Sequence, residues 1–255
     1  MSRGFSLVEL SIVLVILGLL TGGILAGQSL IRAAELRATA TESQRYVSAF
    51  NSFRDKYFAL PGDMTNATKF WGQSTACSGA SATGTCDGDG NGSIGQSAGA
   101  STSGEIFQLW RQLALAGLVE GNYTGISGTT AIDSIPATNV PASKLGNAGW
   151  SVYPLPNYAG DGATYRADYG NQLIIGLRWV GSISEGSAFK PEEAWNIDTK
   201  MDDGKPGTGR IMPRDNVGFG VANGCTTSSS NTDYAGEYRL SNSALACSIK
   251  FLKAL

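Results

Sequence analysis

The sequence predicts an α+β fold in which one long N-terminal helix, first membrane-spanning and then amphipathic, packs on a small globular head with an antiparallel sheet. Three observations support this prediction. Residues 5–27 carry a single charge, Glu9, an apolar stripe with helical spacing continues to Phe58, and all eight prolines and all four cysteines lie after that residue. The first 58 residues of the 255 therefore differ in composition from the rest.

Residues 5–27 are long enough to cross a membrane, because about 20 helical residues rising ~1.5 Å each span the roughly 30 Å hydrocarbon core. A secretory signal peptide fits poorly, since its apolar region is shorter, lacks a carboxylate and ends in a small-residue cleavage site. A simple anchor helix is the better competitor. Glu9 argues against it, because a carboxylate in lipid costs ~2.5–3.5 kcal/mol and demands a partner.

Residues 28–58 predict the amphipathic half of the same helix. After Leu30, Ala33, Ala34 and Leu36, four aromatic residues follow at spacings of four, three and four, which places them on one helical face. These are Tyr46, Phe50, Phe53 and Tyr57. We expect the head to fold against this stripe and Pro61 with Gly62 to end the helix. Charged residues are expected on the other faces: Arg32, Glu35, Arg37, Glu42, Arg45, Arg54 and Asp55.

We expect residues 59–255 to form the globular head, which contains a Gly-rich loop at residues 72–104. Helical periodicity covers residues 104–116, where Gly117 is the expected stop, and a short helix is expected at residues 191–197. Runs rich in β-branched and aromatic residues predict strands. They cover residues 150–153, 172–180, 217–222 and 237–240.

Four cysteines allow three disulfide connectivities. Cys77 and Cys86 lie close together in the Gly-rich loop, and Cys225 and Cys247 lie near the C-terminus. Local pairing, Cys77–Cys86 and Cys225–Cys247, is the most economical of the three. An exported head would be oxidised, and disulfides would then staple loops that bury little surface.

Two acidic stretches are candidate calcium loops. Asp87, Asp89 and Asn91, followed by Gly92, match the start of an EF-hand loop, although the bidentate Glu expected at its twelfth position is Ala98. A solvated Gly/Asp turn is the alternative. Later in the chain, a second set of carboxylates could converge on a cation, with helix capping and turn formation as the alternative. This set is Asp198, Asp202 and Asp203.

The composition also excludes several function classes. The chain has no histidine, which removes Ser-His-Asp triads and His-ligated zinc or iron sites. A net charge of −2 argues against a nucleic-acid partner held by a basic surface. We therefore predict no catalytic residues and no enzyme, and an anchored hydrolase built on Asp and Glu alone is the weakest alternative.

The chain begins with a short basic leader, Met1-Ser2-Arg3-Gly4, and continues Phe5-Ser6-Leu7-Val8-Glu9 into the apolar run. This pattern resembles the class III signal of type IV pilins and type II secretion pseudopilins. In that family a membrane prepilin peptidase cuts after the Gly, and the new N-terminal Phe is N-methylated. The resemblance implies a leader at residues 1–4, cleavage between Gly4 and Phe5, and methylation of Phe5.

The resemblance also implies an assembly role for Glu9. In a helical filament this carboxylate can meet the N-terminal amine of a neighbouring subunit, and pairing two buried charged groups relieves both desolvation costs. The four glycines of the apolar run, Gly18, Gly22, Gly23 and Gly27, mark either close helix packing or a stretch that melts on assembly. The family often has a proline in this region, and this chain has none.

The implied fold is pilin-like and the implied function is that of a structural subunit of a type IV pilus or a pseudopilus. Its partners would be further copies of itself and related pilins, prepilin peptidase, an inner-membrane assembly platform and membrane lipid. The precursor would be a single-pass inner-membrane protein with a periplasmic head, and the product a pilus or pseudopilus, with the cell surface as one destination.

The likeness is close over residues 1–58 and only architectural beyond them. The pair Cys225 and Cys247 resembles the disulfide-bounded loop of many type IV pilins, and the stretch around Asp198, Asp202 and Asp203 resembles the calcium loop of major pseudopilins in composition. The alternative is a monomeric, membrane-anchored calcium-binding module of a secretion or adhesion system.

Overall fold

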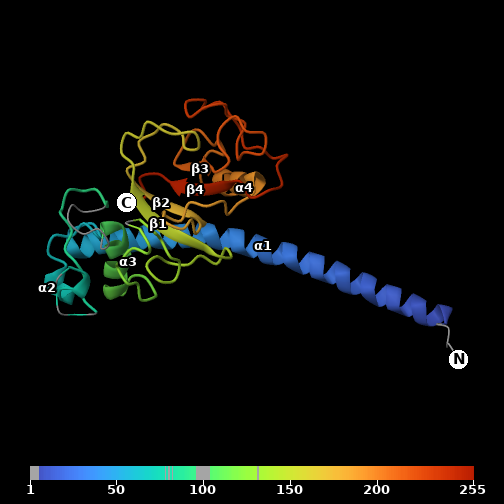
Figure 1. Ribbon diagram of the computed structural model, residues 1–255, viewed down its shortest axis with the longest axis horizontal. Helices are drawn as coiled ribbons and strands as arrows, with labels where there is room; N and C mark the ends of the chain where they lie inside the picture. Colours follow the sequence, from blue (N-terminus) through green and yellow to red (C-terminus); the bar gives the residue numbers. More distant parts are fainter. Residues whose placement is uncertain (1–5, 78, 80, 82, 96–103, 131) are drawn as a thin grey trace.

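The computed structural model describes residues 6–77, 79, 81, 83–95, 104–130 and 132–255. One helix, α1 (Leu7–Tyr57), dominates the shape. Its C-terminal half lies inside the head, whereas its N-terminal half projects from the head, and none of the described elements lies beside it (Figure 1). The predicted α+β arrangement of a long helix and a small antiparallel sheet is confirmed.

Both ends of α1 have physical causes. Ser6 caps the N-terminus, since its hydroxyl accepts from the Val8 amide while the Glu9 carboxylate accepts from the Ser6 amide at 2.8 Å. At the other end Phe58 adopts a left-handed conformation with φ of 54° and its amide donates to the Arg54 carbonyl. The helix thus closes just before Pro61, as the sequence predicts.

The sheet has four antiparallel strands in the order β1-β2-β4-β3. Their bounds are β1 (Ala148–Pro154), β2 (Asn171–Leu177), β3 (Ile211–Asp215) and β4 (Cys247–Phe251). The last strand in the sequence, β4, lies between β2 and β3 and is therefore an inner strand of the sheet. β1 and β2 are paired along their whole length, from Ala148 opposite Leu177 to Pro154 opposite Asn171.

Four short helical segments complete the head: α2 (Thr68–Trp71), the 3₁₀ helix η1 (Thr75–Cys77), α3 (Glu105–Leu115) and α4 (Pro191–Met201). α3 is buried over nearly its whole length, and its polar residues Gln108, Arg111 and Gln112 are buried together with its apolar face. Gly117 follows it with a φ of 73°, a left-handed conformation that glycine adopts without penalty. The helix predicted at residues 104–116 and its stop are therefore confirmed, with Gly104 at the N-cap, and α4 continues past the predicted end at Ile197 to Met201.

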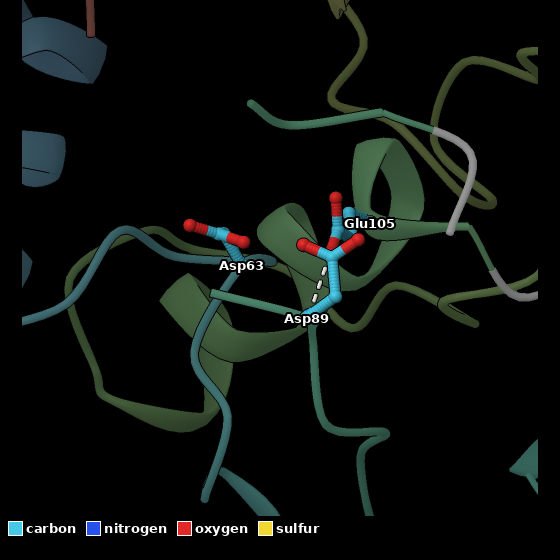
Figure 2. Close-up of side chains that lie close together, drawn as sticks. All are labelled: Asp63, Asp89 and Glu105. Carbon is cyan, nitrogen blue, oxygen red and sulfur yellow. Dashed lines mark hydrogen bonds between the residues drawn. The ribbon is translucent and has the colours of Figure 1, made fainter. Parts of the chain in front are cut away.

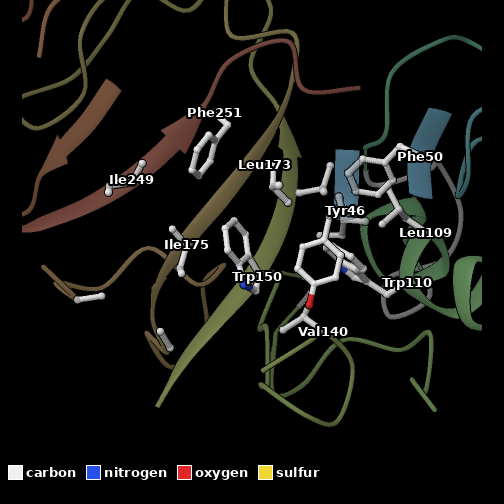
Figure 3. Packing of buried hydrophobic residues seen from close by; sticks show 14 of the residues in the cluster. Tyr46, Phe50, Leu109, Trp110, Val140, Trp150, Leu173, Ile175, Ile249 and Phe251 are labelled. Atoms are coloured by element: carbon white, nitrogen blue, oxygen red, sulfur yellow. The ribbon is translucent and has the colours of Figure 1, made fainter. Parts of the chain in front are cut away.

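The core forms between the aromatic stripe of α1, helix α3 and one face of the sheet (Figure 3). Tyr46 is its centre, because its ring meets Trp110 of α3 at 5.1 Å and Trp150 of β1 at 5.4 Å between centroids. Phe50 and Phe53 are buried beside it, whereas Tyr57 is only partly buried. The predicted docking face of α1 is confirmed, and the earlier residue Leu30 is exposed.

Two predicted strands are wrong. Residues 217–222 form turns, in which Gly218 and Gly220 both have positive φ, and residues 237–240 contribute only the isolated bridge between Tyr238 and Thr226. β3 and β4 were not predicted. β3 contains Pro213, which is tolerated because β3 is an edge strand.

Both disulfides have the local pairing that the spacing favours. Cys77 is bonded to Cys86 and Cys225 to Cys247. The first bridge closes part of the Gly-rich loop. The second bridge links the long loop after β3 to the first residue of β4, and both of its cysteines are fully buried.

Candidate assembly segment and acidic clusters

The projecting half of α1 is apolar and uncovered. Every residue from Ser6 to Ala26 is exposed, and the side chains include Leu7, Leu19 and Leu25 with 85%, 73% and 67% of their surface accessible. The helix is long and apolar enough to span a membrane, and none of its most apolar stretch is buried in the head. Such a continuous apolar surface is unfavourable in water, so lipid or other protein chains must cover it.

Glu9 is the one charged residue of this surface among the described residues. Its carboxylate accepts from the Ser6 amide and has no salt bridge within the described part of the chain. The backbone amide that it caps belongs to the residue directly after Phe5. An N-terminal amine created at Phe5 would therefore lie at the same end of the helix as this carboxylate.

Residues 1–25 match the family model described as "Prokaryotic N-terminal methylation motif". This chain carries the N-terminal signal of the type IV pilin and pseudopilin family. The match covers the signal and most of the exposed apolar half of α1 in the pilin-like chain. No curated protein and no solved structure matches it. The predicted cleavage and methylation residues, Gly4 and Phe5, lie outside the described residues.

Two buried or half-buried contacts fix α1 of the pilin-like chain to its head. The first is an ion pair, in which the guanidinium of Arg32 donates to both carboxylate oxygens of Glu193, at 2.7 and 2.6 Å, and to the Ala188 carbonyl at 2.9 Å. Glu193 also accepts from the Lys190 amide and so caps α4. Although burial opposes its charged form, the Arg32 contact lowers the pKa of Glu193.

The second contact is made by Glu42, which the sequence places on an exposed face. The structure corrects this, because Glu42 is buried between α1 and β1. Its carboxylate accepts from the Ser143 hydroxyl at 2.7 Å, the Lys144 amide at 3.1 Å and the Trp150 indole N–H at 2.8 Å. Three donors satisfy a charge that would otherwise be costly to bury.

The first acidic cluster differs in membership from the predicted EF-hand start. Asp89 lies with Asp63 and Glu105, and one carboxylate oxygen from each of the three lies within 4.8 Å of the other two (Figure 2). The three residues come from the turn after α1, the Gly-rich loop and the start of α3. Burial raises the pKa of both Asp63 and Glu105.

The other two predicted ligands, Asp87 and Asn91, occupy different positions. The Asp87 carboxylate accepts from the amide and hydroxyl of Thr68, at 2.7 and 2.9 Å, and so holds the start of α2. The side-chain amide of Asn91 donates to Asp89 at 2.8 Å. Asp87 therefore does not belong to the acidic cluster. The carboxylates beside Asp89 come instead from Asp63 and Glu105, which are distant from it in the sequence and are brought near by the fold.

Backbone amides already occupy much of this cluster. Asp63 accepts from the amides of Asn91 and Gly92 at 3.0 and 2.9 Å, and Glu105 accepts from those of Asp89 and Gly95 at 3.0 Å each. These contacts close the described part of the Gly-rich loop over α3. The cluster therefore has a structural task, because its carboxylates hold the described part of the Gly-rich loop in place.

The second acidic cluster has the predicted membership. Asp198, Asp202 and Asp203 bring carboxylate oxygens within 4.8 Å of one another at the C-terminal end of α4. Asp198 is fully buried and accepts from the Tyr238 hydroxyl at 2.8 Å, while Asp202 accepts from the amides of Arg210 and Ile211. Burial raises the pKa of Asp198 to about 7, and its two acidic neighbours add to the effect.

Proposed function

We propose that this chain is a structural subunit of a type IV pilus or a pseudopilus. The observation that carries the proposal is the exposed apolar half of α1, most of which falls within the residues that match the N-terminal methylation motif. Proteins with this motif are membrane-anchored precursors that become filament subunits. Lipid covers the apolar surface in the precursor, and the α1 helices of neighbouring subunits cover it in the filament.

Glu9 gives the assembly its register. After cleavage behind Gly4, the amine of Phe5 carries a positive charge, and Glu9 of a neighbouring subunit neutralises it among apolar helices. An unpaired charge in that environment is strongly unfavourable, so only one axial offset between subunits satisfies both groups. The head then faces away from the helical core, attached through Arg32 and Glu42.

The Glu9→Ala variant tests this proposal. We expect the precursor to be made and inserted, but filaments to fall below detection, because the amine of Phe5 would have no partner. The measurement is electron microscopy of sheared material, with mass spectrometry of the N-terminus to identify methylated Phe5. Asp55→Ala is the matched control, since Asp55 is an exposed carboxylate near the other end of α1.

Three results would contradict the proposal. Normal filaments from Glu9→Ala would remove the charge-pairing role. An intact Met1 in a monomeric membrane fraction would favour the alternative of an anchored calcium-binding module. Loss of filaments in Asp55→Ala as well would show that any carboxylate change on α1 disrupts assembly.

We also propose that the head binds calcium through one of its two acidic clusters. Each offers three carboxylates, and no salt bridge involves them in the described part of the chain. Calcium takes six to eight oxygen ligands, so backbone carbonyls and water would complete either site. The repulsion among the carboxylates would then be relieved by the ion.

Thermal melting with and without calcium tests both sites. Calcium is expected to raise the melting temperature of the full chain. Asp89→Asn and Asp203→Asn, made separately, identify the site as the one whose variant loses the increase, while the other variant is the control. Equal melting with calcium and with a chelator in the unmodified chain would end the calcium proposal.

A further inference from the structure

The sheet has one face that does not pack on α1. Side chains alternate along a strand, so Trp150 and Phe251 point into the core with α1, while Tyr153, Arg214 and Lys250 lie on the opposite face. The chain between β1 and β2 and residues after β3 cover part of that opposite face through a separate aromatic cluster. A cavity of about 170 Å³ remains beside this cluster.

The cavity combines charges of both signs with aromatic and hydroxyl groups. Its lining includes Tyr153, Tyr158, Asp161, Glu185, Arg214 and Lys250. It is small beside the roughly 300–1,000 Å³ of pockets for drug-sized ligands. A single monosaccharide-sized group is therefore the largest ligand that it admits.

Two cations in the lining have unused donors. Lys250 is only 2% exposed, yet within the described residues its ammonium makes one long hydrogen bond, 3.4 Å to the Thr164 hydroxyl. Burial lowers the pKa of Lys250 to about 8, which still leaves it charged at neutral pH. The Nε of Arg214 is buried and lies 3.5 Å from Glu185 Oε2 without a hydrogen bond. A ligand carboxylate would pair with the Lys250 ammonium and would compete with Glu185 for Arg214.

The acidic groups suit a different part of a ligand. Asp161 accepts from the amides of Ala163 and Thr164 through one oxygen, and Glu185 accepts from the Ser182 hydroxyl through one oxygen. The Asp161 carboxylate also interacts with the Tyr158 side chain, so a ligand hydroxyl would share or replace that contact. Carboxylates in this position accept hydroxyl groups, which an acidic sugar carries beside its own carboxylate.

An exposed tryptophan that is not part of the cavity lining contacts one of the lining cations. The guanidinium carbon of Arg214 is 5.4 Å from the ring centroid of Trp179, which keeps 46% of its surface accessible. An exposed indole held in place by a cation is a ready surface for an apolar face of a ligand. The neighbouring Tyr153 and Tyr158 offer two further rings inside the cavity.

We propose that this cavity binds one hexuronic acid unit of an acidic saccharide. Lys250 and Arg214 hold its carboxylate, Asp161 and Glu185 accept its hydroxyl groups, and the aromatic rings contact its ring. The cavity lies on the sheet face opposite α1, so it would face outward from the filament. Only that orientation rests on the proposed function, whereas binding itself rests on the cavity.

Calorimetric titration of the full chain in detergent micelles with D-galacturonate tests the proposal. D-galactose is the matched probe, because it has the same ring stereochemistry without the carboxylate, and acetate is the carboxylate without the ring. We expect saturable binding of galacturonate in the millimolar range and at least about tenfold weaker binding of both other probes. Lys250→Met and Arg214→Gln should each weaken galacturonate binding by about tenfold or more.

Lys144→Met is the control, since Lys144 is an exposed lysine outside the cavity. Near-ultraviolet circular dichroism of each variant establishes that the head is folded. Absence of galacturonate binding in the unmodified chain, equal binding of galactose, or undiminished binding by a folded Lys250→Met would overturn the proposal. Acetate as tight as galacturonate would reduce the site to a simple anion site and also overturn it. Because no filament is needed, failure here leaves the filament proposal intact.

Discussion

Lys250 is a buried cation on the inner strand β4, and its burial affects the stability of the fold. It lies on β4 with its ammonium 5.5 Å from the Tyr169 ring centroid, and burial lowers its pKa from 10.5 to about 8. The nearby charges act in both directions, because Glu185 and Asp161 raise the pKa and Arg214 lowers it. Burial is the largest effect, so the folded state holds this proton less tightly than the unfolded chain.

The pH dependence of unfolding should reveal this residue. Between pH 8 and 10.5 the unfolded chain binds more protons at Lys250, so its contribution to folding improves as pH rises through that window. Below pH 8 Lys250 is charged in both states, so the full free-energy cost of burying its charge opposes folding. We therefore expect the advantage of Lys250→Met over the unmodified chain to shrink by roughly 3 kcal/mol across the window.

Denaturant unfolding of both chains at several pH values measures this difference. Burial raises the pKa of the buried tyrosines, such as Tyr165 and Tyr169, so they add a pH dependence of their own, which is common to both chains and largely cancels in the comparison. Parallel pH profiles of the two chains would show that the lysine does not carry the effect.

At the scale of elements, the junction between α1 and the head depends on few polar contacts. Arg32 fixes α1 to α4, and Glu42 fixes it to β1, while the aromatic stripe supplies the apolar area between them. Trp150 takes part in both kinds of contact, since its ring packs on Tyr46 and its indole N–H donates to Glu42. The junction is consequently specific in register as well as apolar.

Glu42→Gln should weaken this junction while keeping its shape. The amide can accept through only one oxygen, so at least one of the three donors around Glu42 loses its partner in a buried site. We expect the free energy of unfolding to fall by about 2 kcal/mol. Chemical denaturation followed by tryptophan fluorescence measures the change and also reports on the Trp150 environment.

Glu237→Gln is the matched control, because Glu237 is exposed on the head. Its unfolding free energy should stay within roughly 0.5 kcal/mol of the unmodified chain. Equal stability of Glu42→Gln and the unmodified chain would mean that the apolar stripe alone positions α1.

These elements also show what the sequence can and cannot predict. α1 and its aromatic stripe follow from local periodicity, and α3 follows from the same rule. Glu42 was misplaced because its partners Ser143 and Trp150 are 101 and 108 residues away, and charge alone indicates exposure. Similarly, Asp63 and Glu105 come to Asp89 through the tertiary fold, which a search for ligands within one loop cannot find.

The whole molecule divides its surface between two tasks. The large exposed apolar residues of the described chain gather in α1 between Leu7 and Ile31, whereas those of the head are scattered. The head keeps its long loops closed by Cys77–Cys86 and Cys225–Cys247 and holds its own aromatic core. We therefore expect the head to fold whether or not the N-terminal half of α1 is covered by lipid or by other chains.

Removal of residues 1–28 should convert the chain into a soluble monomer. The truncation leaves Arg32, Glu42 and the aromatic stripe in place, so every described contact between α1 and the head remains. It removes the apolar surface that demands lipid or further copies, and we expect no filaments and no need for detergent. Sedimentation gives the oligomeric state, and near-ultraviolet circular dichroism compares the head with that of the full chain. Aggregation, or loss of the tertiary signal, would show that the N-terminal half of α1 also stabilises the head.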